Sequence, residues 1–162
     1  MGLFGKKGKQ REVKIRAPLS GKIIPLEKVP DPVFAQKMMG EGIAIEPTEG
    51  IVVAPFAGEL LTCFPHALGI KSEEGLELLI HVGIDTVKFK GEGSEKLVNQ
   101  GDKVEEGKLL IKFNLDYYRK NAPSLISPLV ITNMQIVSKL NKSEVKDVTA
   151  GEEIILRALL KE

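Results

Sequence analysis

The chain of 162 residues has the size of one domain, and at that length a single core buries roughly two thirds of the unfolded chain's surface. Hydrophobic residues make up 43% of the chain and charged residues 28%, a balance that excludes an intrinsically disordered protein. The 23 lysines and arginines nearly cancel the 22 acidic residues, so the composition gives no support for a nucleic-acid partner, which a basic face would indicate.

Residues 1–14 come first in chain order, and their lysines Lys6, Lys7 and Lys9 predict a flexible basic tail that makes at most weak contact with an anionic membrane. This segment has no apolar stretch long enough for a secretory signal, and no window of the chain approaches the roughly 20 apolar residues of a membrane span. The single cysteine, Cys63, excludes a disulfide within the chain and favours a reducing compartment. These features predict a cytoplasmic protein.

Residues 15–162 are expected to form one domain of short apolar runs, which Gly, Pro, Asn and Asp interrupt at the spacing typical of all-β proteins. We therefore expect an antiparallel β-sandwich or barrel with a few short helical turns. Helical turns are expected at residues 31–39, 94–99 and 116–121. In the first of them, Asp31 is a candidate capping residue and Pro32 suits the first helical position.

Two pairs of segments resemble each other within this domain. "APLSGKI" at residues 17–23 and "APFAGEL" at residues 54–60 share Ala-Pro, a glycine, a charged residue and an aliphatic residue. "VNQGDKV" at residues 98–104 and "VTAGEEI" at residues 148–154 form the second pair. The irregular spacing argues against a solenoid, so we expect one β-motif that is used more than once within a single core.

A histidine lies in the middle of the strand-like run "LLIHVGIDTV" at residues 78–87. In a strand, alternation places His81 on one face with Leu79, Gly83 and Asp85, and it leaves the other face for the core. Because Gly83 has no side chain, the imidazole is open on one flank to another backbone segment or to a phosphate.

The chain's other histidine, His66, ends a second apolar run, and the turn "KSEEG" at residues 71–75 separates the two runs. A hairpin through this turn brings His66 and His81 onto neighbouring strands. Two adjacent imidazoles suit a metal site completed by Asp85 or by a partner's carboxylate, or they suit acid–base catalysis. They also suit attack on phosphorus, because an unperturbed pKa of about 6.5 leaves much of the imidazole neutral. Residue spacing leaves these three chemistries open.

The segment "GLELLIHVGIDTV" at residues 75–87, followed by "KGEG" at residues 90–93, resembles the active-site segment of the glucose-type enzyme IIA proteins. These are phosphocarriers of the bacterial phosphoenolpyruvate-dependent sugar phosphotransferase system. The resemblance extends to residues 17–47 and to "SPLVITN" at residues 127–133. It implies an antiparallel β-sandwich or barrel that accepts a phosphoryl group from phosphorylated HPr. The group then passes to a cysteine of a IIB domain for sugar uptake.

The same resemblance implies roles for single residues. His81 matches the histidine that is phosphorylated, and His66 matches the second active-site histidine, which steadies the phosphoryl group without being modified. Gly83, Asp85 and Thr86 are expected to support the site. The transfer itself needs neither a cofactor nor a metal, although the two histidines are possible zinc ligands together with a partner. A monomer is expected.

A surface for docking partners is predicted around residues 30–40. Their apolar side chains are spread too widely for one helical stripe, so some of them are expected to face solvent as an apolar patch. Methionine adapts to more than one partner, and the resemblance places this segment beside the active histidines. The candidate residues of this patch are Val33, Phe34, Met38, Met39 and Leu79.

Three positions depart from the family's pattern. Phe64 stands two residues before His66, where the family usually has a threonine that is hydrogen-bonded to the active-site network, and "CFPHA" is two residues shorter than the usual "FxTxHA". Val82 and Ser94 stand where the family often has phenylalanine, after the active histidine and after "KGEG". We expect these changes to leave the nucleophile intact and to alter partner choice or rate.

Three other functions are alternatives. A regulatory IIA-like protein would carry phosphate on His81 but rarely pass it on to sugar. A metal-dependent hydrolase would use His66, His81 and Asp85, but the chain lacks the additional His-x-His pair of zinc peptidases on related β folds. A biotin- or lipoyl-type swinging-arm carrier would use the turn-rich segment at residues 99–110, but the lysine to be modified is missing, because Lys37 is followed by Met38 but preceded by Gln36 and no hairpin tip surrounds it.

Overall fold

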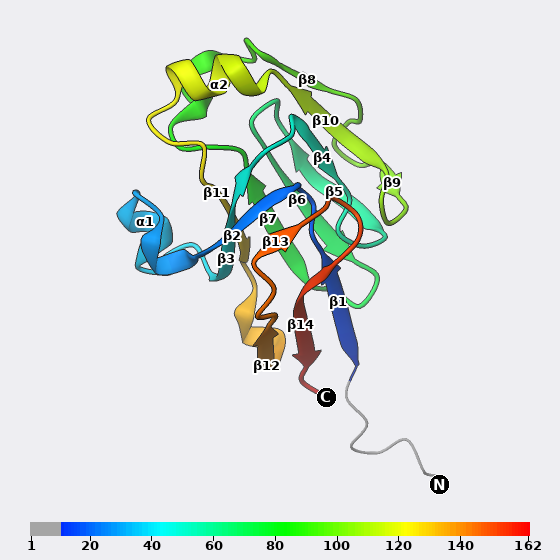
Figure 1. The fold of residues 1–162 in the computed structure, drawn as a ribbon. Coiled ribbons are helices and arrows are strands. Elements are labelled where there is room, and N and C mark those ends of the chain that lie inside the picture. Colours follow the sequence, from blue (N-terminus) through cyan, green and yellow to red (C-terminus); the bar gives the residue numbers. More distant parts are fainter. Residues whose placement is uncertain (1–10) are drawn as a thin grey trace, which may run out of the picture.

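The computed structural model describes residues 11–162, which fold mainly into antiparallel strands arranged in three sheets (Figure 1). This architecture confirms the predicted all-β class with few short helices. The strands of the largest sheet are β2 (Gly21–Pro25), β3 (Glu41–Pro47), β5 (Gly58–Cys63), β6 (Ala67–Ser72), β7 (Glu77–His81), β9 (Lys103–Val104), β11 (Ser127–Ile131) and β13 (Asp147–Val148). Their order across the sheet is β13-β2-β3-β11-β7-β6-β5-β9.

Two smaller sheets pack with this one. Their strands are β1 (Glu12–Arg16), β14 (Ile154–Leu160) and β12 (Val137–Lys142) in the first sheet, and β4 (Ile51–Val53), β10 (Leu109–Phe113) and β8 (Ser94–Lys96) in the second. In Figure 1 the first of them lies near both labelled ends of the chain, and the second lies at the opposite end of the molecule, next to α2 (Leu115–Asn121).

Strand β1 begins inside the segment that was predicted to be a flexible tail. It pairs antiparallel with β14, and the side chain of its residue Val13 is buried in the core. The boundary expected at residue 14 is therefore wrong, because the burial of Val13 fixes the start of this strand in the sheet. The rest of the predicted tail, with its lysines and its membrane contact, lies at residues 1–10, outside the described residues.

Short helices connect some of the strands. They are the α-helices α1 (Pro32–Ala35) and α2, and the 3-10 helices η1 (Leu26–Lys28), η2 (Thr86–Phe89) and η3 (Met134–Ile136). Within residues 11–162, no helix is long and apolar enough to cross a membrane.

The predicted helical turns at residues 31–39 and 116–121 are confirmed, whereas the one at residues 94–99 is wrong. The Asp31 side chain accepts a hydrogen bond from the backbone N–H of Val33 at 3.0 Å, as expected for a capping residue. Helix α1 is shorter than predicted, because Lys37 has a left-handed φ of 62°. The segment at residues 94–99 begins with strand β8 instead of a helical turn, because β8 pairs with β10.

Buried side chains form two hydrophobic clusters. The larger cluster includes Ile15, Ile45 and Ile111, which come from three different sheets. The smaller cluster consists of Leu26, Val29, Phe34, Ala44, Ile84 and Val130. Along β3 the residues Ala44 and Ile45 belong to different clusters, so the two clusters lie on opposite faces of the largest sheet. Helices η1 and α1 therefore cover the face opposite the main core.

The two Ala-Pro segments lie side by side and exchange reciprocal hydrogen bonds. The backbone N–H of Arg16 donates to the Pro55 carbonyl at 3.0 Å, and that of Val53 donates to the Pro18 carbonyl at 2.9 Å. Residues 16 and 53 both precede the Ala-Pro motif, so the two segments are related as by a local two-fold axis. The prediction that one β-motif is used more than once in a single core is confirmed.

The second pair of similar segments is related in a different register from the one expected. Val104 lies opposite Gly58, and Val148 lies opposite Gly21, so that each valine faces the glycine that begins a strand. The expected alignment of residues 98–104 with 148–154 matched Val148 with the wrong valine. The pairing of β9 and β13 with their neighbours decides this register, and the short motifs did not reveal that pairing.

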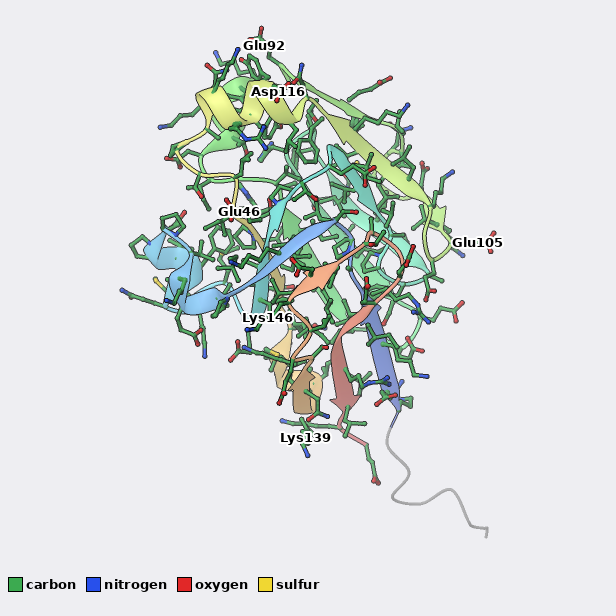
Figure 2. The ribbon with its side chains drawn as sticks, in the orientation of Figure 1. Glu46, Glu92, Glu105, Asp116, Lys139 and Lys146 are labelled. Atoms are coloured by element: carbon green, nitrogen blue, oxygen red, sulfur yellow. The ribbon has the colours of Figure 1, made fainter. Side chains whose placement is uncertain are left out.

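Charged side chains lie at the edges of the molecule. Figure 2 shows Glu92 and Asp116 near α2, Glu105 after β9 and Lys139 in β12, all directed away from the body of the fold. Acidic and basic groups are therefore both found around the periphery, as the nearly balanced composition predicts.

Gly42 in β3 is packed so closely against β11 that a methyl group does not fit. A Cβ atom there would lie 1.9 Å from the Leu129 carbonyl oxygen and 3.0 Å from the Cα atom of Val130. We therefore expect Gly42→Ala to lower the free energy of unfolding by about 2–4 kcal/mol in urea denaturation.

Gly75→Ala provides the matched control for this substitution. A Cβ atom at Gly75 would have no neighbour within 4 Å, so the only cost is its φ of +104°. We expect a loss of about 1 kcal/mol, which is clearly smaller than for Gly42→Ala. Equal losses for the two variants would show that the clash with β11 is relieved without cost.

Candidate functional site

The two histidines lie next to each other at the end of a β-hairpin. Strands β6 and β7 pair antiparallel with Ala67 opposite His81, and the backbone N–H of Val82 donates to the His66 carbonyl at 2.8 Å. The imidazole centroids are 5.3 Å apart, and the rings meet edge to face at 71°. The predicted hairpin is confirmed and brings the two histidines together, but His66 lies in the turn before β6 and not on a neighbouring strand as expected.

One hydrogen bond orients the His81 ring. Its Nδ1 atom lies 2.7 Å from the carbonyl oxygen of Gly83. A carbonyl oxygen can only accept a hydrogen bond, so Nδ1 carries the proton and Nε2 keeps its lone pair. The tertiary structure thus selects the tautomer in which Nε2 has the free lone pair.

Burial keeps both imidazoles neutral. It lowers the pKa of His81, and this effect is partly offset by the hydrogen bond to Gly83 and by the negative charges of Asp31 and Asp85. Burial also lowers the pKa of His66, and the neighbouring His81 lowers it further. A neutral ring at cellular pH is the state that a nucleophile toward phosphorus requires.

The strand that carries His81 ends at that residue, earlier than the sequence indicated. Gly83 has a φ of +72°, and a Cβ atom there would lie 2.9 Å from the Thr86 methyl group and 3.1 Å from the Ser124 carbonyl oxygen. The space expected beside Gly83 is therefore filled by another backbone segment, which was one of the two expected occupants. The role of Gly83 is to present its carbonyl to His81.

Asp85 and Thr86 follow this turn and no longer continue the strand. Asp85 has a left-handed φ of 60°, its side chain is half exposed, and it pairs with Lys88 at 3.7 Å. The expectation that Asp85 shares a strand face with His81 is therefore wrong, although its charge still acts on the imidazole. Thr86 is buried, as expected, and its hydroxyl donates to the Val82 carbonyl at 2.6 Å, so it stabilises the turn.

Phe34 was a candidate for the predicted solvent-facing patch, but it does not lie on the surface. It is buried in the smaller cluster, and its ring centroid lies 5.6 Å from that of His81. The contact arises because η1 and α1 fold over β3 and β11, whose side chains Ala44 and Val130 form the floor of that cluster. Phe34 therefore supports the imidazole from inside. Leu79 is half-buried against the same cluster.

Several large apolar side chains remain exposed near the ends of the elements that carry the site. Their exposed fractions range from 40% for Val33 to 69% for Met38. The predictions for Val33, Met38 and Met39 as exposed residues are confirmed. Sequence reasoning did not propose Phe64 and Val87 as members of this surface, although both are more than half exposed. The signal for Phe64 was its unusual position two residues before His66.

A metal centre at the histidines is not assembled by the fold. In the part of the chain that the structure describes, no group of three or more His, Cys, Asp and Glu side chains lies close enough to hold a metal ion. The ligand set of the hydrolase alternative, His66, His81 and Asp85, is therefore not brought together, because the turn at Gly83 directs Asp85 away from the strand.

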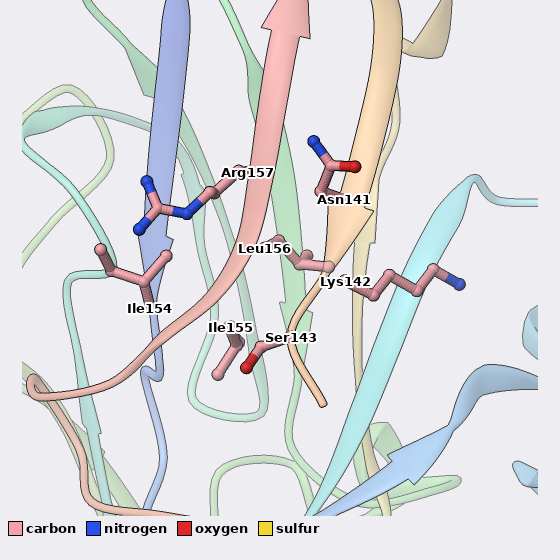
Figure 3. A pocket seen from close by; sticks show the side chains of 7 residues that line it. All are labelled: Asn141, Lys142, Ser143, Ile154, Ile155, Leu156 and Arg157. Atoms are coloured by element: carbon pink, nitrogen blue, oxygen red, sulfur yellow. The ribbon is translucent and has the colours of Figure 1, made fainter. Parts of the chain in front are cut away.

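A separate pocket of about 230 Å³ lies between β12 and β14 (Figure 3). Its lining residues are Asn141, Lys142, Ser143, Ile154, Ile155, Leu156 and Arg157. Its two cationic groups are already paired, Lys142 with Glu41 at 2.8 Å and Arg157 with Glu12 at 3.4 Å. The lining contains no histidine, cysteine or carboxylate, so the histidine pair is the stronger functional site.

Comparison with known proteins decides the family. The family model described as "phosphoenolpyruvate-dependent sugar phosphotransferase system, EIIA 1" matches residues 13–137. This chain belongs to that EIIA family. Proteins named "PTS system glucose-specific EIIA component" from Staphylococcus aureus and Staphylococcus epidermidis are 50% and 49% identical to this EIIA chain over 157 residues, which cover 95% of it and 95% of each relative.

A solved structure supports the same assignment. The glucose permease IIA from Mycoplasma capricolum matches this EIIA chain with a TM-score of 0.86 and 36% identity, covering 97% of this chain and 99% of the other. The protein is a phosphocarrier and a component of the phosphotransferase system, as the resemblance implied. The family implies HPr and the IIB domain of a sugar permease as partners. The swinging-arm alternative has no support from these matches.

The burial of Phe34 predicts a stability effect that an exposed docking residue would not have. We expect Phe34→Ala to lower the free energy of unfolding by about 3 kcal/mol, because the truncation leaves a cavity beside His81 and Val130. Met38→Ala, in an exposed side chain of the same segment, should change it by less than about 0.5 kcal/mol. Chemical denaturation of both variants measures the difference, and similar small changes would place Phe34 on the surface.

Proposed function

We propose that His81 is the residue that accepts the phosphoryl group from phosphorylated HPr and passes it to a cysteine of a IIB domain. The observation that carries this proposal is the hydrogen bond of 2.7 Å between His81 Nδ1 and the Gly83 carbonyl, which leaves Nε2 as the only nucleophilic nitrogen of the ring. The lowered pKa of His81 favours the neutral form that can attack.

The transfer exchanges one bond to phosphorus for another. The lone pair of His81 Nε2 forms the new N–P bond while the bond between phosphorus and HPr breaks, and its electron pair returns to HPr. The IIB thiolate then attacks the same phosphorus atom, and the electron pair of the N–P bond returns to His81. Such a transfer depends mainly on positioning and on stabilisation of charge, which a fixed imidazole and its neighbour supply.

His66 is proposed to steady the phosphoryl group without being modified. Its ring lies edge to face with that of His81 at a centroid distance of 5.3 Å, so a ring N–H can reach oxygens attached to His81 Nε2. When His81 carries a phosphoryl group, the neutral neighbour of His66 becomes negatively charged. This charge favours the protonated form of His66, in which both ring nitrogens donate hydrogen bonds. Binding of the group thus strengthens the donor that holds it.

Both partners are proposed to use the same face, because both must reach His81 Nε2. The exposed residues Val33, Met38 and Met39 lie on the segment whose Phe34 contacts His81, so they supply an apolar surface at the right place. Leu79 packs against the smaller hydrophobic cluster, and its exposed part is proposed to belong to the same apolar surface. We further propose that the protein is a cytoplasmic monomer. The names of its relatives support a glucose-type permease as the system in which it acts. Weak membrane contact by the N-terminal lysines is a part of the same proposal.

The first experiment measures the intact mass of the protein after it is mixed with phosphoenolpyruvate, enzyme I and HPr. We expect a gain of one phosphoryl group that is stable in base, lost in acid and absent from His81→Ala. His66→Gln should still accept the group but should donate it to a IIB domain at least tenfold more slowly, roughly the effect of losing a donor to a charged group.

Two outcomes would contradict this assignment. Acid-labile phosphate on His81→Ala would place the modified residue elsewhere. A wild-type protein that takes up phosphate but does not pass it to a IIB domain would instead identify the regulatory alternative. An active EIIA protein in the same reaction is the control for the donor proteins.

The ring of His81 should titrate abnormally in the free protein. Because its pKa is lowered, we expect nitrogen-detected NMR to show protonation with a midpoint below the ordinary value of about 6.5. Above that midpoint the ring should be neutral with the proton on Nδ1, and acceptance from HPr should decline as the pH falls through it. A midpoint above 6.5, or a proton on Nε2, would contradict the proposed nucleophile.

A further inference from the structure

The segment before His66 is a tight turn that sets the direction of two neighbouring rings. The Phe64 N–H donates to the Ala67 carbonyl at 2.8 Å, and the Ala67 N–H approaches the Phe64 carbonyl at 3.4 Å. The connection between β5 and β6 therefore has Pro65 and His66 at its two central positions. This geometry explains how the chain forms a hairpin although the segment is two residues shorter than the family's pattern.

A side chain from another sheet holds this turn in place. The hydroxyl of Ser94, at the start of β8, donates to the Pro65 carbonyl at 2.5 Å. The ring of Pro65 restricts its φ, and Ser94 holds its carbonyl, so the turn at Pro65 has little conformational freedom. Ser94 and Phe64 are two of the three positions that depart from the family's pattern, and Ser94 bonds the residue that follows Phe64.

The Phe64 ring lies against the His66 ring. Their centroids are 5.9 Å apart and their planes are inclined by 30°, as in an offset stack. The His66 ring also meets the His81 ring edge to face. Within residues 11–162, no hydrogen bond to a His66 ring nitrogen is formed, so these two ring contacts are what orients the imidazole.

We propose that Phe64 is a positioning residue, which holds the His66 imidazole against His81 by ring stacking and thereby aims its N–H at the phosphoryl group. This inference rests on the proposed role of His66. In the part of the chain that the structure describes, both ring nitrogens of His66 are free of protein hydrogen bonds, so they remain available to phosphoryl oxygens. Phe64 is still 54% exposed, so its outer part can be covered by a docked partner.

The test compares three variants of the full chain. Phe64→Ala removes the ring, Phe64→Tyr keeps a ring of the same shape, and Leu97→Ala truncates another exposed apolar side chain, which has no ring to stack on a histidine. Steady-state kinetics of phosphoryl transfer from HPr to a IIB domain separates kcat from KM for each variant. NMR titration of the His66 ring in the free protein provides a readout that needs no partner.

We expect Phe64→Ala to lower kcat about three- to tenfold, the rate effect that corresponds to losing one aromatic contact, while KM changes by less than about twofold. Its His66 ring should titrate at a higher pH than in the wild-type protein, because the burial that lowers its pKa is reduced. Phe64→Tyr should restore both values, and Leu97→Ala should leave both unchanged.

The inference is overturned if Phe64→Ala titrates and transfers like Leu97→Ala, or if only KM changes, because that result would make Phe64 a docking residue. Failure of the proposed function is a different result. In that case the wild-type protein takes up no phosphate on His81, while the NMR titration of Phe64→Ala still tests whether the stack positions His66.

Discussion

The antiparallel pairing of β6 with β7 is the constraint on which the site depends, because it places Ala67 opposite His81. A slip of one residue would turn every side chain of the slipped strand to the other face. Leu68 and Ile80 are fully buried in the main core, so such a slip would expose them and bury an imidazole. The free energy of core burial therefore also maintains the distance of 5.3 Å between the two imidazoles.

His81 lies where the second hydrophobic cluster meets the surface, and this position gives it the properties of a nucleophile. The cluster supplies Phe34 on one side of the ring, and burial lowers its pKa. The hydrogen bond to the Gly83 carbonyl and the negative charges of Asp31 and Asp85 act against this lowering of the pKa. Burial is the larger effect, so the pKa of His81 stays below its ordinary value. An imidazole in this position can both attack phosphorus and be released from it, as a carrier requires.

The surroundings of the two histidines differ in kind. His81 is fixed by a hydrogen bond to its own chain, whereas His66 is held between aromatic rings at the tip of a two-residue turn. The first arrangement leaves one nitrogen of His81, Nε2, with a free lone pair. The second leaves both ring nitrogens of His66 without a hydrogen-bond partner among residues 11–162. This division of roles agrees with one residue that forms a bond to phosphorus and one that only steadies the group.

The sequence by itself determined the all-β class, the hairpin that joins the histidines and the cap at Asp31, because alternation and capping depend on residues that are close along the chain. Only the tertiary structure decided the turn after His81, where the Gly83 N–H donates to the Ser127 hydroxyl across 44 residues. It also decided the burial of Phe34, since the strands that receive this side chain are far away in sequence. Local patterns carry no information about such distant contacts, and these contacts set the orientation and the pKa of the reactive imidazole.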